Sequence, residues 1–444
     1  MEAQEEQMQQ DNHKIGFWQL VSIVISCELG SSIFLLPKEL AQFGFYGLVG
    51  WIVGGIGAVM IAVTFAFLCS RSGITGSACK YVKMSFGEKA GFFMNWAYWC
   101  AAWMCNPIII STSISYLMEA TGYLNPITQL MVEIAIVLIL TIINTRGIQV
   151  SSNVEICLTI FKILPLLIVP VCAIKYMSLD NITSMKSNYD ASMIHVSIFK
   201  IILLAALKAF WGFTGLEGCT STAEFVKESS KTLPLAIIVG TSFVAIISLF
   251  NTLSIFAIIK PDQMQNIDAP FAHVMMKLFG ENIGGIVGIM TFVMCIGSIN
   301  AWILFSGQIA RSAVKEEMMP EYFGKLNKYN VPARSLWISA IGTIIILCIL
   351  KLPFLNANAI SDVVDMSVVV YIVLYVLAIL SYIKIMINNK EKSILHHLIT
   401  ILALVFCIAV LVNTEFKSFA FLAFMFTTGV PAYIITARNA SKIK

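Results

Sequence analysis

Long apolar stretches separated by short polar connections make up most of the chain. After a polar, acidic start (MEAQEEQMQQDNHKI), runs of about twenty apolar residues recur, each long enough as a helix to cross roughly 30 Å of hydrocarbon. The pattern predicts an all-α polytopic membrane protein with twelve transmembrane helices, near residues 16–38, 45–69, 89–118, 127–144, 156–176, 199–225, 233–258, 283–311, 335–354, 359–383, 394–413 and 416–436.

Two of these spans are interrupted by small residues at corresponding places. The first span reads ISCELGSSIFLLP and the sixth reads AFWGFTGLEGCTST. Because the sixth span opens a second set of five, and five is odd, the second copy of such a unit enters the membrane from the opposite side. Gly-interrupted helices at matched positions of inverted halves indicate a binding site near the bilayer midplane. The alternative is that these glycines serve close helix packing.

The resulting organisation has five parts along the chain. We expect a cytoplasmic tail over residues 1–15, a first five-helix repeat over 16–176 and an inverted second repeat over 199–383. Two additional C-terminal helices over 394–436 and a second cytoplasmic tail over 437–444 follow.

Interrupted helices supply unpaired backbone groups to a ligand. Gly30, Ser31 and Ser32 offer N–H groups and two hydroxyls, and the N-terminus of a half-helix attracts an anion such as a carboxylate. The stretch Trp211-Gly212-Phe213-Thr214-Gly215 offers carbonyls that attract an ammonium, and an aromatic plane. Together these groups suit a zwitterion, an α-amino acid held at both ends.

Composition and charge agree with a membrane protein. Apolar residues make up 58% of the chain and charged residues only 12%, about half the roughly 25% that is usual in soluble domains, and the mean hydropathy is +0.84. A large soluble enzyme and a disordered chain are excluded. Of the 29 Lys and Arg residues, nineteen lie in the segments on the N-terminal side of the membrane and eight on the other, so both termini are expected in the cytoplasm.

The sequence gives no support for a metal site, a cofactor or an enzyme active site. The eleven cysteines and five histidines form no cluster with metal spacing, and no GxSxG, HExxH or P-loop motif occurs. The acidic start lacks the features of a signal peptide. We therefore expect no metal, no cofactor and no nucleic-acid partner, and the net charge of +4 gives no reason to expect one. An intramembrane enzyme stays a minor alternative.

Four segments together resemble a known family. They are GSSIFLLPKEL in the first span, WCAAWMCN in the third, FWGFTGLEGCTSTAEFVKESSKTLP in the sixth, and GSINAWILFSGQIARSA followed by MMPEYFGKLNKYNVPARS. The chain resembles the amino acid–polyamine–organocation superfamily, especially the bacterial arginine/agmatine antiporters and their basic amino acid and polyamine relatives. The resemblance implies two inverted repeats of five spans plus two extra helices, alternating access, a bacterial inner membrane and a homodimer as in the antiporters.

The resemblance also implies roles for individual residues. Ser31 and the N–H groups around Gly30 and Ser32 would hold the substrate carboxylate, and Trp211 would be an aromatic lid on the outer side. Ser32 departs from the family, which usually has glycine there, and adds a hydroxyl.

Further roles concern the substrate side chain and the inner gate. By the resemblance, Trp302 and Asn106 would contact the substrate side chain, Tyr98 would belong to the inner gate, and Glu217 would be a carboxylate near the site. Without the resemblance, Trp302 and Tyr98 would be assigned to the membrane interface or to core packing.

Four of the charged residues within predicted spans bear on the mechanism, Glu28, Lys162, Lys208 and Glu217, because a charge there costs at least about 2.5–3.5 kcal/mol. Their charges sum to zero, so two structural ion pairs are one explanation. In the other, Lys162 gains and loses a proton during transport, because apolar surroundings disfavour its charged form. The stretch FKILPLL around Lys162 resembles proton-coupled permeases of the same superfamily, in which this lysine takes the place of sodium.

Glu28 bears on the identity of the substrate. Beside the expected pocket, its carboxylate would favour a basic amino acid such as arginine, lysine or ornithine, whereas a pair between Glu28 and Lys208 would leave no charge for a cation. Neutral amino acids and polyamines are the other candidate substrates, and exchange and proton symport both stay open. A non-transporting amino acid sensor is the alternative from another class. Asp362 and Asp365 are expected in an outer vestibule, as solvated carboxylates.

Overall fold

The computed structural model of the chain describes residues 15–30, 32–70, 77–178, 182, 197–259, 261–264, 267, 269–280, 283–352 and 359–443. Its α-helices are α2 (Phe17–Glu28), α3 (Ser32–Ala41), α4 (Phe45–Ser70), α5 (Ala78–Phe86), α6 (Glu88–Met104), α7 (Asn106–Thr121), α8 (Pro126–Asn144), α9 (Ile148–Ala173), α12 (Ile198–Phe210), α13 (Ser229–Ile258), α14 (Pro261–Met264), α15 (Pro270–Phe279), α16 (Gly284–Lys315), α17 (Glu321–Gly324), α18 (Ala333–Leu350), α19 (Ala359–Asn388), α20 (Ile394–Val412) and α21 (Phe416–Ile443). Three short 3₁₀ helices are η1 (Ile174–Tyr176), η2 (Trp211–Phe213) and η3 (Gly218–Phe225).

The predicted fold class is confirmed. Within the described part of the chain, twelve helical segments are long and apolar enough to cross a membrane, and they follow the predicted spans closely. The N-terminal tail lies outside the described residues except for Ile15. The last helix, α21, continues through most of the predicted C-terminal tail, to Ile443.

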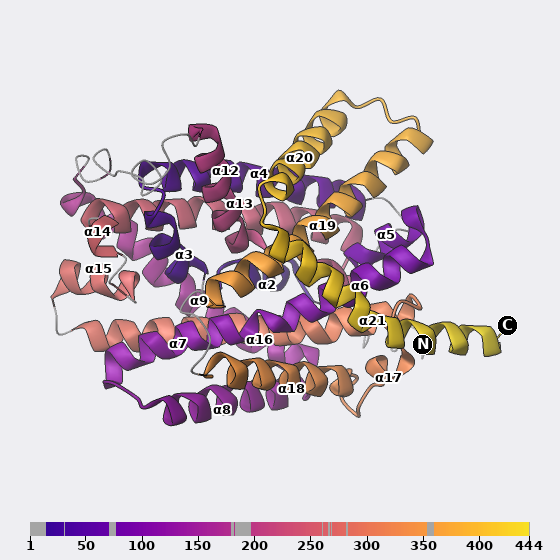
Figure 1. Cartoon of the computed structure of the whole chain (residues 1–444), viewed down its shortest axis with the longest axis horizontal. Coiled ribbons are helices and arrows are strands. Elements are labelled where there is room, and N and C mark those ends of the chain that lie inside the picture. Colours follow the sequence, from indigo (N-terminus) through magenta and orange to yellow (C-terminus); the bar gives the residue numbers. More distant parts are fainter. Residues whose placement is uncertain are drawn as a thin grey trace, which may run out of the picture.

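The spans run across the view in Figure 1, and short helices mark their two ends. Helices α14 and α15 lie at one end, and α5 and α17 lie at the other. Helices α7, α8, α16 and α18 lie side by side along one flank, whereas α4, α12 and α13 pack together on the opposite flank. Small residues allow the close approach there, because a Cβ atom on Gly50 would lie only 2.5 Å from Cβ of Ala205.

The first span is broken at Leu29 and Gly30, between α2 and α3. The break exposes carbonyls of the α2 C-terminus, and other groups satisfy them. Ser32 Oγ donates to the carbonyl of Glu28 over 3.0 Å, and Ser298 Oγ of α16 donates to the carbonyl of Leu29 over 3.0 Å. These contacts make an unwound segment tolerable inside a membrane, where no water would otherwise satisfy the backbone.

The sixth span is broken over a longer stretch, from Trp211 to Phe225. Helix α12 tightens into η2, turns at Gly215, and resumes as η3. Gly215 has φ +102°, a conformation that side-chain-bearing residues rarely adopt. Its N–H donates to the hydroxyl of Tyr375 on α19 over 3.4 Å. The two predicted interruptions are therefore both present, although the inverted-repeat boundaries stay a prediction.

The third span contains an interruption that the sequence pattern did not predict. Helix α6 ends at Met104 and α7 begins at Asn106, with Pro107 in its first turn. Proline has no N–H to donate to the preceding turn and clashes with its carbonyl, so it favours a break there.

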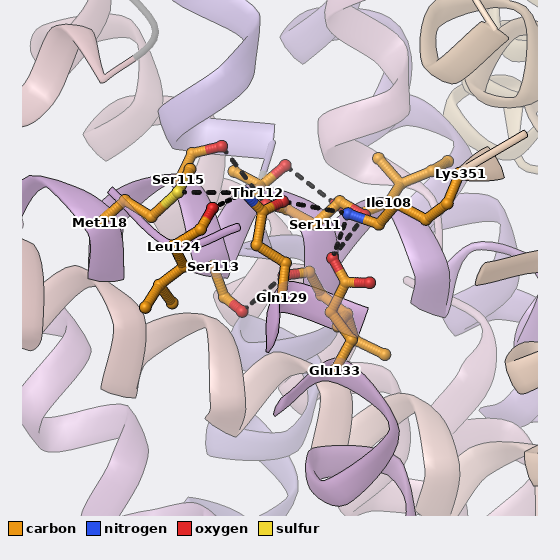
Figure 2. Close-up of polar contacts among 11 residues, drawn as sticks. Ile108, Ser111, Thr112, Ser113, Ser115, Met118, Leu124, Gln129, Glu133 and Lys351 are labelled. Atoms are coloured by element: carbon orange, nitrogen blue, oxygen red, sulfur yellow. Dashed lines mark hydrogen bonds and ion pairs between the residues drawn. The ribbon is translucent and has the colours of Figure 1, made fainter. Parts of the chain in front are cut away.

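A buried ion pair joins α8 to the end of α18, on the flank that also contains α7 and α16. Glu133 of α8 is fully buried and accepts from Lys351, which follows α18, over 3.0 Å. Figure 2 shows the Lys351 ammonium directed toward Glu133 and Gln129, with Ser111 of α7 donating to the same carboxylate. The sequence analysis did not single out Glu133, although it lies within the predicted fourth span.

This ion pair predicts the stability of two variants. Lys351→Met should lower the free energy of unfolding by about 3 kcal/mol, because it leaves the Glu133 carboxylate buried without a cation. The fall should appear as a lower melting temperature of the purified protein in detergent. Lys392→Met, at an exposed lysine, is the control. Glu133→Gln/Lys351→Met should recover most of the loss, and equal melting of the single and double variants would contradict this explanation.

Candidate functional site

A small cavity lies between the two broken spans. Its walls come from α2 and α3, from the break of the sixth span, from α7 and from α16, and they comprise Cys27, Glu28, Gly30, Ser32, Cys105, Ile109, Trp211, Thr214 and Trp302. Six of these residues are among those singled out from the sequence: Glu28, Gly30, Ser32, Trp211, Thr214 and Trp302. The cavity has a volume of about 10 Å³, room for about one water molecule.

Glu28 is the charged group on the cavity wall. Its side chain is 1% exposed, and Oε1 accepts from Thr241 Oγ1 of α13 over 2.6 Å. Oε2 is buried and has no hydrogen-bond partner among the described residues. A carboxylate oxygen without a partner at this depth is costly, so it provides a place for a donor from a ligand.

The suggested pair between Glu28 and Lys208 is wrong. Lys208 Nζ lies 2.8 Å from Asp365 Oδ2 of α19 and 3.9 Å from Glu39 Oε2 of α3. Tertiary packing places Lys208 at the end of the bundle where α3 ends and α19 begins, away from the cavity. Asp365 is thus ion-paired rather than only solvated, and Asp362 is likewise paired with Lys417 over 2.8 Å.

An aromatic row extends from the cavity wall into the core. The ring of Trp302 lies 5.9 Å from that of Tyr371 on α19, and Tyr371 lies 5.8 Å from Tyr98 on α6, both in edge-to-face contact. Tyr98 is thus linked to Trp302 of the cavity wall through Tyr371. The sequence analysis did not identify Tyr371, whose ring joins the two residues that it did.

Glu217 stabilises the broken segment of the sixth span. The hydroxyl of Tyr375 donates to Glu217 Oε2 and accepts from the N–H of Gly215. Gly215 itself lies against the cavity wall, because a Cβ atom on it would be 3.0 Å from Cζ2 of Trp302. Tyr375 therefore holds the carboxylate and the turn together, a role that the sequence did not predict.

Lys162 of α9 lies at the end of α2, where the helix unwinds. Its fully buried ammonium donates to Ser298 Oγ over 2.8 Å and to Ser26 Oγ over 3.3 Å, and the carbonyl of Ser26 is 3.5 Å away. Ser298 in turn donates to the carbonyl of Leu29. A cation at a helix C-terminus is electrostatically favourable, so Lys162 stabilises the break between α2 and α3.

Glu155, about two turns before Lys162 on α9, is a second buried charged residue that the sequence pattern did not indicate. It lies one residue before the predicted start of the fifth span, so the sequence pattern does not predict that its side chain is buried. The structure buries it fully: Oε2 accepts from Asn300 Nδ2 over 2.9 Å, and Oε1 has no partner in the described residues. The charges of Glu155 and Lys162 act on each other, with Ser26 near both.

Among the described residues, the predicted substrate-binding residues Asn106 and Gly215 are not part of the cavity wall. Asn106 is buried beside Cys105, and its Oδ1 has no partner in the described part of the chain, but it does not form part of the wall. Ser31 lies outside the described residues.

The buried charges around the break between α2 and α3 do not sum to zero, as the explanation by two neutral ion pairs requires. Glu28, Glu155 and Glu217 are all fully or almost fully buried near it, and Lys162 is the ammonium among them. The expectation of two neutral pairs is therefore wrong for this part of the structure, where carboxylates outnumber ammonium groups. No group of three or more His, Cys, Asp or Glu side chains within the described residues is placed to hold a metal ion.

Twelve apolar spans, two of them interrupted around a cavity that a buried carboxylate lines, define a secondary membrane transporter. The chain belongs to the amino acid permease family, whose model matches residues 15–435. It is 27% identical to the putrescine transporter PotE of Haemophilus influenzae, over 84% of each chain. It is 24% identical to the arginine/ornithine antiporter of Pseudomonas aeruginosa, over 75% of this chain and 70% of that protein. The predicted family is confirmed.

The glycines at the two breaks, Gly30 and Gly215, should respond differently to alanine. Gly215→Ala should destabilise the protein by about 1–2 kcal/mol, because the backbone there is left-handed and the new methyl group would press on Trp302. Gly30→Ala should leave the melting temperature in detergent unchanged, because the nearest atoms to its Cβ would be 3.8 Å away. Equal destabilisation by both substitutions would contradict the assignment of the turn to Gly215.

Proposed function

We propose that the protein transports an organic cation, a basic amino acid such as arginine, lysine or ornithine or an aliphatic diamine, by alternating access. The observation that carries the proposal is the Glu28 carboxylate, which lines the cavity with one oxygen unpartnered among the described residues. The relatives named as transporters of putrescine and of arginine and ornithine support the same substrate class.

The surplus of carboxylates supports a positively charged substrate. Three buried carboxylates lie near one ammonium, and the charge of Glu217 acts on Glu28. In a poorly solvated interior, such an excess of negative charge is relieved by a proton or by a bound cation. A substrate ammonium that reaches Glu28 would therefore be held by hydrogen bonding and by the surrounding charge.

The other end of an amino acid would meet the start of α3. Gly30 and Ser32 line the cavity at this helix N-terminus, which attracts a carboxylate. Trp211 and Trp302 supply aromatic faces, and we assign Trp211 to the outer lid and the row from Trp302 to Tyr98 to the inner barrier. The cavity as described holds about one water, so binding requires its walls to move apart, as alternating access demands.

The proposed orientation follows from the loops. The cationic segments between spans place both termini in the cytoplasm of a bacterial inner membrane. The end of the bundle with α14 and α15 then faces outward, and the end with α5 and α17 faces the cytoplasm (Figure 1).

The first experiment is uptake of radiolabelled substrates into proteoliposomes. Arginine, lysine, ornithine, putrescine, leucine and serine are tested with empty or preloaded vesicles, with and without an inward proton gradient. Uptake that needs internal substrate indicates exchange, and uptake into empty vesicles that needs the gradient indicates symport. Ornithine differs from putrescine by its carboxylate, so the ratio of their uptake rates measures the contribution of the α3 N-terminus. Uptake of neutral amino acids alone would contradict the proposal.

Glu28→Gln should raise the KM for the transported cation at least about thirtyfold, because losing one partner of a buried charge pair costs about 2–5 kcal/mol. Glu321→Gln, at an exposed glutamate of α17, should leave the KM unchanged. The amide keeps the size of the side chain, and an unchanged melting temperature shows that the fold is retained. Cation uptake with an unaltered KM in Glu28→Gln would refute the role of this carboxylate.

Lys162 is proposed to carry the coupled proton, with Glu155 and Ser26 beside it. Lys162→Ala should abolish the stimulation of uptake by an inward proton gradient, while exchange without a gradient continues. The ratio of uptake with and without the gradient measures this directly. Lys200→Ala, at an exposed lysine of α12, is the matched control. Full gradient-dependent uptake by Lys162→Ala would exclude Lys162 as the coupling group.

A further inference from the structure

A second and larger cavity lies at the end of the bundle that the proposed orientation places outside. Its volume is about 340 Å³, within the range of small-molecule sites. Its wall comes from α3, α12, α19 and the connection between α20 and α21, and it comprises Glu39, Gln42, Phe43, Leu204, Leu207, Lys208, Asp362, Asp365, Asn413, Thr414, Glu415, Lys417 and Ser418. It shares no residue with the cavity of Glu28 and Trp211.

Four carboxylates and two ammonium groups line this outer cavity. Lys208 is shared between Asp365 at 2.8 Å and Glu39 at 3.9 Å. Lys417 is shared between Asp362 and Glu415, each at 2.8 Å. Each lysine thus serves two carboxylates, and the wall carries a net charge of −2 when all six groups are ionised.

A second observation points to a ligand. Ser418, in the first turn of α21, is fully buried, yet its Oγ has no hydrogen-bond partner within the described part of the structure. Ser418 is one of the residues that form the wall of the outer cavity. Buried hydroxyls are ordinarily hydrogen-bonded, so this one is a lone-pair acceptor available to a bound donor.

The chemistry of the wall selects the class of ligand. The carboxylates do not converge as metal ligands do, since the described residues contain no group suited to a metal ion. They are instead distributed over two lysine-centred pairs, which suits two separated positive charges. Ammonium groups, as donors without acceptors, match carboxylates and an unpartnered hydroxyl.

We propose that the outer cavity is a second binding site, for an organic dication that carries two ammonium groups. The ligand neutralises the excess charge and competes with Lys208 and Lys417 for their carboxylates. The proposal rests on the proposed function only for the choice of an ammonium ligand, because the central cavity plays no part in the site.

The test is equilibrium binding of radiolabelled putrescine to the full chain in lipid nanodiscs, in the Glu28→Gln background that disables the central site. Saturable binding should persist and should weaken about fivefold or more in Asp362→Asn/Glu415→Gln, and high salt should weaken it further. Lys208→Met should instead tighten binding about threefold, because it removes a competing ammonium. Lys200→Met is the matched control, and Lys417→Met repeats the test if Lys208→Met does not fold.

Three results would overturn the proposal. The first is loss of all saturable binding in Glu28→Gln, which would leave the proposed function standing. The second is weaker binding in both Lys208→Met and Lys417→Met, as a purely structural role of these lysines predicts. The third is displacement of putrescine by Mg²⁺ at equal concentration, which would make the cavity a site for an inorganic cation. Equal putrescine binding by the wild-type protein and by Glu28→Gln would support the outer site and would count against the central one.

Discussion

The structure depends on how an unwound backbone is satisfied inside a membrane. Each break leaves carbonyl and N–H groups without helical partners, in surroundings where water cannot replace them. At the first break, Ser298 donates to the carbonyl of Leu29, and Lys162 donates to Ser298 and Ser26. At the second, Tyr375 accepts from Gly215 and donates to Glu217. Side chains of α9, α16 and α19 therefore stabilise the unwound backbone around the central cavity.

These supports introduce charge, and part of their stabilising effect depends on that charge. Lys162 stabilises the α2 C-terminus only while it is protonated, because a neutral amine loses its electrostatic attraction to the helix end. Deprotonation would therefore loosen the junction between α2 and α3, which forms one wall of the cavity. Glu155 lies on the same helix and acts on Lys162, and its second oxygen accepts from Asn300. The same groups that make the break tolerable can thus make its geometry depend on protonation.

The sequence predicts spans and breaks well because both arise from local composition. Twenty apolar residues must form a helix in lipid, and clusters such as GSS and WGFTG mark where two helices unwind. Tertiary pairing is different. Lys208 and Asp365 are far apart in the chain, and nothing local distinguishes Asp365 from Glu28 as a partner. Tyr371 and Tyr375 look like ordinary span aromatics, and Glu155 sits at a span boundary, so only packing reveals that they belong to the site.

Helices α12 and α19 line the outer cavity and continue to residues that form or contact the wall of the central one. Lys208 lies on α12 three residues before Trp211, so the outer ion pair and the wall of the central cavity are separated by one helical turn. On α19, Asp365 faces the outer cavity, while Tyr371 and Tyr375 support the central one. Opening the central cavity by tilting α12 away from α19 would stretch the contact between Lys208 and Asp365. If the proposed outer site is occupied, an ammonium ligand that takes over Asp365 would remove that restraint, and arrival of a cation there would favour the movement that admits it to the inner cavity.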